Sequence, residues 1–444
     1  SFPTRRSSDL GCVHSISVAL EQLREKLAGI DANSPGFYVF DVAFALNDAF
    51  DPLTFLASQS CFPQFYWQQR SGEDEAAALG QVLRFTSLAE ARHFLDDNPE
   101  YDLRIWGLNA FVSQQGELFL PRLEWRREGG RAFLRLIVIN DAAQRGDAEQ
   151  ARAFIDALVR AKSLPDVQME LVSQQHCPEQ SGWEALVTQA TQAIARGEMD
   201  KVVLARATDY RFSQPVNAAA LMAASRRLNH HCFHYFIAFD PHNAFLGSSP
   251  ERLWRRRGTS LRTEALAGTV ANDTDDTRAA ELGNWLMNDD KNQRENMLVV
   301  EDICQRLQRA AATLDVLPPQ IVRLRKVQHL RRCIWTEMRH KDDAECLTLL
   351  QPTAAVAGLP RQAARAFITQ YEPFAREWYA GSAGYLSLKQ SEFCVALRCA
   401  KISGTTVRLY AGAGIVAGSD PTMEWQEIEN KAAGLRSLLI MKHA

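Results

Sequence analysis

Several charged side chains of this sequence adjoin apolar segments, and their types suit acid–base chemistry. Lys201 leads into the apolar run Val-Val-Leu-Ala, so it could be a base at the start of a buried strand or a lysine that reaches water. Glu251 follows a strand-breaking Ser-Ser-Pro, where it could be a general acid or the partner of a nearby arginine. Arg398 lies within an apolar strand, where a buried guanidinium needs an anion or an internal carboxylate.

Two predicted helices carry glutamates beside their apolar faces. Glu295 projects between apolar residues of its helix, where a carboxylate is costly unless it is paired or bound to a cation. Glu424 and Glu427 follow one edge of the helix predicted for 421–440, with Lys431 one turn further on. Taken singly, each glutamate could belong to a solvated margin. Carboxylates from two helices, with no Cys or His nearby in sequence, favour Mg²⁺ over zinc.

Two segments rich in small residues could bring the backbone close to a ligand. Ala267, Gly268 and Thr269 form a predicted tight turn after a strand, and small residues allow close backbone approach. Gly412 and Gly414 belong to a predicted glycine loop ahead of the last helix. Backbone N–H groups near a helix N-terminus attract carboxylate or phosphate.

Composition limits the partners and the compartment. The chain has 444 residues and a formal net charge of -3, which gives no electrostatic case for nucleic acid or an anionic membrane. No window approaches the roughly 18 apolar residues of a membrane helix. The nine cysteines lack CxxC spacing, which fits a reducing, cytoplasmic setting. Residues 1–10, "SFPTRRSSDL", are interpreted as a non-native leader.

The pattern of elements indicates an α+β protein. Strands follow one another at hairpin distance, which favours mainly antiparallel pairing with helices packed outside. No GxGxxG or GxxxxGK[ST] motif supports a nucleotide fold. Residues 11–170 are expected to form the N-terminal part of an interleaved fold, and 175–440 the catalytic part. The main helices are predicted for 15–28, 88–96, 277–312, 360–370 and 421–440.

Eight segments in this order resemble the chorismate-utilising enzymes. They are "KVVLARA", "GSSPERL", "ALAGT", "QRENMLVVEDI", "QPTAAVAGLP", "REWYAGSAGY", "VALRCAKI" and "YAGAGIVAGSDPTMEWQEIENKA". The N-terminal stretches "FYWQQR", "LRIWGLNAF" and "LPRLEWRR" are similar to the menaquinone-specific isochorismate synthase branch. The resemblance implies a fold like anthranilate synthase component I: two largely antiparallel sheets packed together, helices outside, and an active site in a cleft.

The resemblance also assigns roles to residues. Lys201 matches the lysine that activates the attacking water, and Glu251 matches the general acid. Glu295 and Glu427 match the Mg²⁺ ligands, with Glu424 acting through water. The matching substrate-binding positions are Ala267, Gly268, Thr269, Tyr379, Arg398, Gly412, Gly414 and Lys431.

The implied activity is a Mg²⁺-dependent, reversible conversion of chorismate to isochorismate, with no obligate protein partner. The chemistry needs a neutral lysine and a protonated glutamate, and burial in a dry cleft favours both forms. Ala267 argues against aminodeoxychorismate synthases, which carry a nucleophilic lysine there. Salicylate synthase and anthranilate synthase component I remain alternatives, as does a non-catalytic sensor of chorismate-like anions.

Two positions depart from the family pattern. Gln351 stands where many relatives have histidine, so a polar contact near the substrate ring is expected to differ. Asn292 stands where many relatives have a glutamate one turn before the metal ligand, which lowers the expected negative charge around Mg²⁺.

Overall fold

The computed structural model describes residues 11–31, 34–46, 49–141 and 146–440. The predicted leader, 1–10, lies outside the described residues. Within them, 20 strands form one hydrogen-bonded network, and every pairing between named strands is antiparallel. The expected antiparallel α+β architecture is confirmed. No helix in the described ranges is long and apolar enough to cross a membrane.

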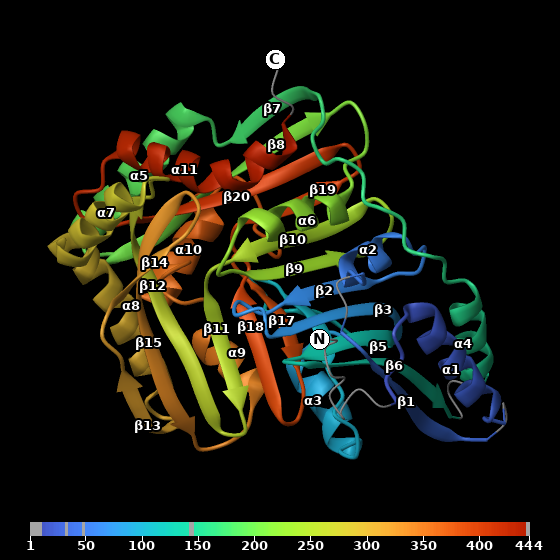
Figure 1. The fold of residues 1–444 in the computed structure, drawn as a ribbon. Coiled ribbons are helices and arrows are strands. Elements are labelled where there is room, and N and C mark those ends of the chain that lie inside the picture. The colour runs from blue at the N-terminus through green and yellow to red at the C-terminus, as the bar shows by residue number, and fades with distance from the viewer. Residues whose placement is uncertain (1–10, 32–33, 47–48, 142–145, 441–444) are drawn as a thin grey trace, which may run out of the picture.

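The expected two sheets are two arms of this network, which diverge from strand β5 (Figure 1). We name them the β8 arm and the β12 arm. β5 (Gly116–Glu128) carries one arm on each edge, and its residues 123–128 pair with β6 (Arg131–Asn140) on the same edge as the β12 arm. β6 in turn pairs with β1 (Gly36–Phe44).

The β8 arm runs outward from β5 in the order of its pairings and ends at β8, which β7 and β16 flank. Its strands are β3 (Asp74–Phe85), β2 (Gln64–Gln68), β9 (Phe233–Ala238), β10 (Asn243–Ser249), β19 (Cys399–Ser403), β20 (Thr406–Ile415), β8 (Lys201–Phe212), β7 (Leu171–Cys177) and β16 (Gly358–Leu359).

The β12 arm leaves β5 through β4 and ends at β15, which β13 and β14 flank. Its strands are β4 (Ile105–Asn109), β17 (Ser382–Leu386), β18 (Gln390–Val395), β11 (Arg252–Arg257), β12 (Ser260–Ala271), β15 (Val327–Met338), β13 (Ala311–Val316) and β14 (Gln320–Arg323).

Two hydrophobic cores hold the helices to these arms. The first contains residues of both arms, and Trp67 of β2 packs against Trp106 of β4 and Tyr385 of β17. It also takes in α3 (Leu88–Asp97), α5 (Gln180–Ala195), α8 (Asp290–Leu307), α9 (Asp343–Leu350) and α10 (Arg361–Tyr371). The second lies beneath α1 (Ile16–Ala28), α2 (Pro52–Ala57), α4 (Asp147–Asp156) and α6 (Ala218–Leu228).

The helix predicted for 277–312 is wrong as a single element. The chain forms α7 (Asp276–Asn288) and α8 (Asp290–Leu307), and residues from Ala311 onward belong to β13. Asp289 separates the helices because its backbone is extended and its carboxylate accepts the backbone N–H of Asn292, which caps α8. The last helix, α11 (Pro421–Leu439), matches its prediction, with Asp420 accepting the N–H of Met423.

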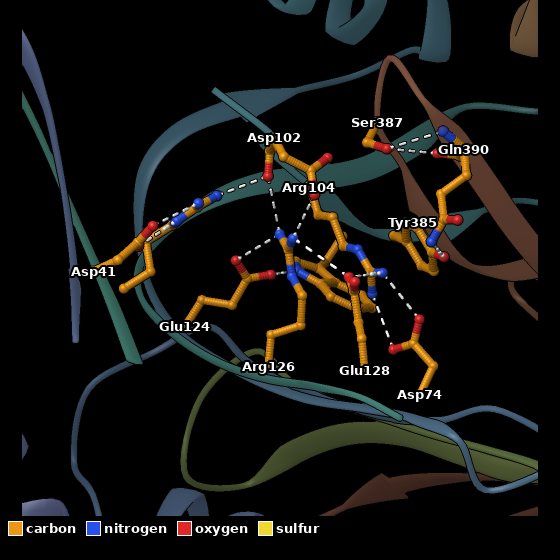
Figure 2. Close-up of polar contacts among 12 residues, drawn as sticks. Asp41, Asp74, Asp102, Arg104, Glu124, Arg126, Glu128, Tyr385, Ser387 and Gln390 are labelled. Atoms are coloured by element: carbon orange, nitrogen blue, oxygen red, sulfur yellow. Dashed lines mark hydrogen bonds and ion pairs between the residues drawn. The ribbon is translucent and has the colours of Figure 1, made fainter. Parts of the chain in front are cut away.

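Buried charge ties the N-terminal strands to the β12 arm. The guanidinium of Arg104, in the loop before β4, lies 3.9 Å from the ring centre of Tyr385. It also donates to Asp74 of β3 at 2.9–3.0 Å and to Glu128 of β5 at 2.6 Å (Figure 2). Arg126 extends this network toward Asp102 and Glu124. Because Arg104 is fully buried, these carboxylates are what allow its charge to remain there.

Two glycines face each other where β4 meets β17. Gly107 and Gly384 are directly paired in register. A Cβ on Gly107 would lie 2.0 Å from the carbonyl oxygen of Glu117, and one on Gly384 would lie 2.0 Å from that of Glu392. The missing side chains therefore allow β4 to lie against β5, and β17 against β18, on either side of this seam.

We expect Gly107→Ala to destabilise the fold by about 2–4 kcal/mol, because the backbone must move to admit a methyl group. Gly130→Ala is the control, since nothing lies within 4 Å of its added Cβ, and its effect should stay within about 0.5 kcal/mol. Urea unfolding of both variants measures the difference. Equal stability of the two would contradict the importance of the seam.

Candidate active site

A cavity of about 60 Å³ lies between the β8 arm and the β12 arm, with α8 and α11 contributing side chains. All the predicted site residues line it except Lys201 and Glu424. The structure therefore brings together residues that are far apart in the sequence: Glu251, Ala267, Gly268, Thr269, Glu295, Tyr379, Arg398, Gly412, Gly414, Glu427 and Lys431.

Lys201 is the first residue of β8, as the sequence predicted, and its side chain is 1% exposed. Its Nζ lies 3.4 Å from Oε1 of Glu295 on α8. Gly414 of β20 is the other close neighbour, since a Cβ there would be 3.0 Å from the lysine Cε and 2.8 Å from the same glutamate oxygen. Lys201 therefore contacts Glu295, which lines the cavity, but does not line the cavity itself.

Glu251 occupies the connection between β10 and β11, and its backbone is fixed on both sides. Its N–H donates to Oγ of Ser249 at 3.2 Å, and its carbonyl accepts the N–H of Val395 at 3.0 Å. Burial raises the pKa of the Glu251 carboxyl to about 8, and the nearby carboxylate of Glu264 raises it further against the opposing charge of Lys201. At neutral pH, Glu251 is therefore a protonated acid that faces the cavity.

The segment Ala267–Thr269 is a bulge inside β12, and the predicted turn after a strand is wrong. Its register against β15 shifts between Leu266 and Thr269, and Gly268 takes a φ of +96°, a conformation that glycine adopts without strain. A bulge redirects the strand toward the cavity while keeping it hydrogen-bonded to β15.

Two asparagines of α8 hold this bulge. Asn292 accepts the N–H of Thr269 at 3.2 Å and donates to Asp289 at 2.6 Å. Asn296 donates to the carbonyls of Ala265 and Ala267, each at 3.1 Å. Asn292, which departs from the family pattern, therefore supports the part of β12 that lines the cavity. Asn296 has no signal in the sequence, since an asparagine within a charged helix resembles a surface residue.

Gly412 and Gly414 lie in the paired strand β20, and the glycine loop predicted for them is wrong. These positions need glycine because there is no room for a side chain: a Cβ on Gly412 would be 2.6 Å from the hydroxyl of Tyr379. That tyrosine stacks on Tyr410 with ring centres 4.9 Å apart. The missing side chains allow Tyr379 and Glu295 to reach across the strand.

Arg398 is held by a histidine that sequence analysis missed. Its Nη2 donates to Nε2 of His329 at 2.8 Å, so Nδ1 of that ring carries the proton and faces Thr269 Oγ1 at 3.0 Å and Gly268 O at 3.3 Å. Burial, together with the charge of Arg398, lowers the pKa of His329 well below its usual value. A neutral imidazole thus orients the guanidinium and does not repel its positive charge.

Three carboxylates and a lysine meet at α11. Lys431 lies 3.0 Å from Glu427 and donates to the carbonyl of Gly412 at 2.8 Å. Burial would raise the pKa of Glu427, but the Lys431 ammonium outweighs it and lowers that pKa. Burial and the neighbouring Glu427 raise the pKa of Glu424 to about 9, and Glu295 adds to the effect.

These carboxylates fit a hard cation. Glu424 has a buried Oε2 with no hydrogen-bond partner among the described residues. As the side chains stand, no three Asp, Glu, His or Cys residues of the described chain group closely enough to hold a metal ion. Glu295 and Glu427 instead point to Lys201 and Lys431. A divalent ion would satisfy the orphaned oxygen and offset the repulsion between these carboxylates.

Gln351 does not line the cavity. Its Nε2 donates to the carbonyl of Ala110 at 2.9 Å, and the side chain of Gln114 donates to the backbone carbonyl of Gln351. The expected change of a polar contact near the substrate ring stays a prediction. Gln351 fixes the loop between β4 and β5 against the end of α9, at a distance from the cavity.

The cavity contains a protonated glutamate and a cluster of carboxylates, with a buried lysine beside it. This combination is in keeping with an enzyme that uses acid–base chemistry. The chain belongs to the chorismate-binding enzymes, whose family model ("Chorismate binding enzyme") matches residues 109–440. It is 65% identical to the isochorismate synthase MenF of Escherichia coli (strain K12) over 431 residues, which is 97% of this chain and 100% of that protein. The MenF protein of Haemophilus influenzae is 40% identical, over 88% of this chain and 90% of that protein.

Solved structures agree with this placement. The menaquinone-specific isochorismate synthase MenF of Escherichia coli superposes with a TM-score of 0.93 at 65% identity, over 96% of this chain and 99% of that one. Anthranilate synthase component I of Streptococcus pneumoniae superposes with a TM-score of 0.60 at 19% identity, over 98% of this chain and 100% of that one. The second match confirms the predicted fold.

Proposed function

We propose that this protein is an isochorismate synthase, which moves a hydroxyl of chorismate by adding water at C2 and releasing the hydroxyl at C4. The observation that carries the proposal is a buried, protonated Glu251 in the same cavity region as the buried Lys201. Acid and base catalysis together match a reaction that takes a proton from water and gives one to a leaving hydroxyl. The 65% identity to MenF over nearly the whole chain supports the same reaction.

Lys201 and Glu251 carry out the two proton transfers of the reaction. Lys201, in its neutral form, takes a proton from the water that attacks C2. Glu251 gives its proton to the C4 hydroxyl as the carbon–oxygen bond breaks, and the ring double bonds shift between the two carbons. Both residues end with the opposite protonation, so the reverse reaction uses them in exchanged roles.

Cations around the cavity suit a substrate with two carboxylates. Arg398, oriented by His329, and Lys431, beside Gly412, would each bind a carboxylate, and Tyr379 would donate its hydroxyl. The cavity of about 60 Å³ holds about two waters, so the long side chains at its wall must move outward when the substrate enters. Ala267 leaves no amine nucleophile at that position.

Glu295 and Glu427 would hold Mg²⁺, with Glu424 bound to it through water. When bound, Mg²⁺ supplies positive charge that anchors the ring carboxylate and offsets charge developing in the ring. The orphaned, buried oxygen of Glu424 supports this assignment. The lysine partners of Glu295 and Glu427 would then be free to face water and substrate.

The proposal extends to compartment and pathway. The nine cysteines are scattered without CxxC spacing, which is in keeping with a reducing cytoplasm. The length and identity shared with the MenF proteins, which are menaquinone-specific in the solved example, favour menaquinone synthesis as the destination of the product.

Lys201→Ala should abolish isochorismate formation, because it removes the base that takes the proton from water. Chorismate and Mg²⁺ in ¹⁸O-labelled water, with and without ammonia, followed by chromatography and mass spectrometry, report the product and its label. The wild type should form isochorismate with ¹⁸O at C2. Lys389→Ala, at an exposed position, should behave like the wild type. Salicylate or anthranilate as the main product would refute the proposed activity.

The forward kcat/KM should fall as pH rises through about 8, the pKa of Glu251. The sign follows from its role, since the acid must carry its proton before C4 can lose hydroxyl, and the protonated form predominates below that pKa. Glu251→Gln should lower kcat by about 10²-fold or more and remove this limb of the pH profile. A variant profile that keeps the same alkaline limb would assign the titration to another group.

Glu295→Gln should raise the Mg²⁺ concentration needed for half-maximal binding at least about tenfold. Thermal unfolding against Mg²⁺ concentration measures this without turnover. Glu301→Gln is the matched control, because Glu301 is exposed on the same helix. Identical Mg²⁺ curves for wild type and Glu295→Gln would contradict the ligand assignment.

A further inference from the structure

A second cavity, of about 610 Å³, lies on the face of the β12 arm that points away from the core. We call it the arginine cavity. It shares no lining residue with the active-site cavity. Strands β11, β12, β14, β15 and β18 and the turn between β2 and β3 contribute to its walls. Seven arginines line it, against three carboxylates: Arg70, Arg252, Arg255, Arg257, Arg262, Arg323 and Arg331, with Glu73, Asp74 and Glu392.

Part of this positive charge is paired inside the protein. Arg70 makes two hydrogen bonds of 2.9 Å to Glu264, and Arg252 makes one of 3.0 Å to Glu392. Arg323 is paired with Asp276 at 2.8 Å. Asp74 is already engaged by Arg104, outside the cavity. The acids of the wall therefore leave most of the remaining arginines without a counter-charge.

Four arginines have no carboxylate of the described residues within ion-pair distance: Arg255, Arg257, Arg262 and Arg331. Arg255 and Arg262 face each other directly across the β11–β12 pair, and like charges at such positions destabilise a sheet. Arg262 has no carboxylate partner, but its guanidinium lies 4.2 Å from the ring centre of Trp335, which partly stabilises the charge.

Two further observations indicate that these arginine charges are unfavourable without a bound partner. The Nε of Arg331 is buried without a hydrogen-bond partner among the described residues. Burial, and then the neighbouring Arg252 and Arg257, lowers the pKa of Arg255 to about 10. A protein surface with these features is stabilised by an anion that accepts several guanidinium hydrogen bonds at once.

The dimensions and charge select the kind of anion. A volume of about 610 Å³ is in the range of small-molecule sites. A formal net charge of -3 for the chain gives no broad field for nucleic acid, so the positive charge is local to this cavity. Four unpaired guanidinium groups on three adjacent strands match a ligand with at least two closely spaced phosphates, each with oxygens for bidentate binding.

We propose that the arginine cavity binds a small molecule that carries a diphosphate group. Arg255, Arg257 and Arg331 donate to the phosphate oxygens, and Arg262 closes the site from β12. Arg70, which lines this cavity, donates to the carbonyl of Pro250 at 2.8 Å, immediately before Glu251. The Arg70–Glu264 pair therefore separates the arginine cavity from the active site, and the two sites bind different ligands.

Inorganic pyrophosphate is the probe, measured by isothermal titration calorimetry at 150 mM salt in buffer free of Mg²⁺, since Mg²⁺ would chelate it. We expect one site per chain in the wild type and at least about tenfold weaker binding in Arg255→Gln/Arg262→Gln. Arg278→Gln, an exposed arginine on α7, should bind as the wild type does. The double variant without ligand should also melt higher than the wild type, because a like-charge pair has been removed.

Arg398→Gln separates this cavity from the active site and should leave pyrophosphate binding unchanged. Loss of binding in Arg398→Gln together with full binding in the double variant would overturn the proposal, as would no binding by the wild type at millimolar pyrophosphate. If circular dichroism shows that the double variant does not fold, Arg257→Gln replaces it, since Arg257 is exposed. Its affinity should fall at least about threefold, and an unchanged affinity would also reject the site.

Discussion

The close approach of the paired glycines Gly107 and Gly384 to the backbones of β5 and β18 is the constraint on which the architecture depends. These residues join β4 to β17, and through that pair the N-terminal strands become part of the β12 arm. The same strands enter the β8 arm where β2 pairs with β9. Both arms thus share β5 as their origin and diverge from it, which creates the space between β8, β20 and β12 where the active-site cavity lies. The buried Arg104 reinforces this seam from the side of Tyr385.

Charge inside the active site is balanced in a way that suits its chemistry. Glu251 has no lysine or arginine within ion-pair distance among the described residues, so burial keeps it protonated. Glu295 and Glu427, by contrast, each have a lysine partner, and Glu424 is left with an unsatisfied oxygen. Glu251 can therefore serve as an acid, while the ammonium of Lys431 lowers the pKa of Glu427 and favours its anionic form. Burial alone would treat all four alike, and it is the placement of Lys201 and Lys431 that distinguishes them.

Features set by local sequence were predicted well. Asp420 and Pro421 mark the start of α11, and the position of Lys201 at the start of a buried strand is confirmed. Predictions failed where a local signal competes with tertiary contacts. Asp289 breaks a continuous helical pattern because its carboxylate caps the second helix. The Ala267–Thr269 segment remains in its strand as a bulge, since pairing with β15 continues on both sides of Gly268. His329 and Asn296 went unnoticed, as their roles depend on neighbours from other elements.

The sequence by itself determined the class of fold and the positions of the strand that begins at Lys201 and of the last helix. Through the family resemblance it also determined which residues are candidates for the active site. Residue type and spacing are enough for this, because helix capping, strand alternation and small-residue motifs are local. Only the tertiary structure shows which carboxyl is buried without a charged partner and which ones have a lysine beside them, and a pKa depends on burial and on charges brought from distant segments. It alone also gathered arginines of β11, β12 and β15 into one cavity, because the register between strands is fixed by the packing of the whole sheet.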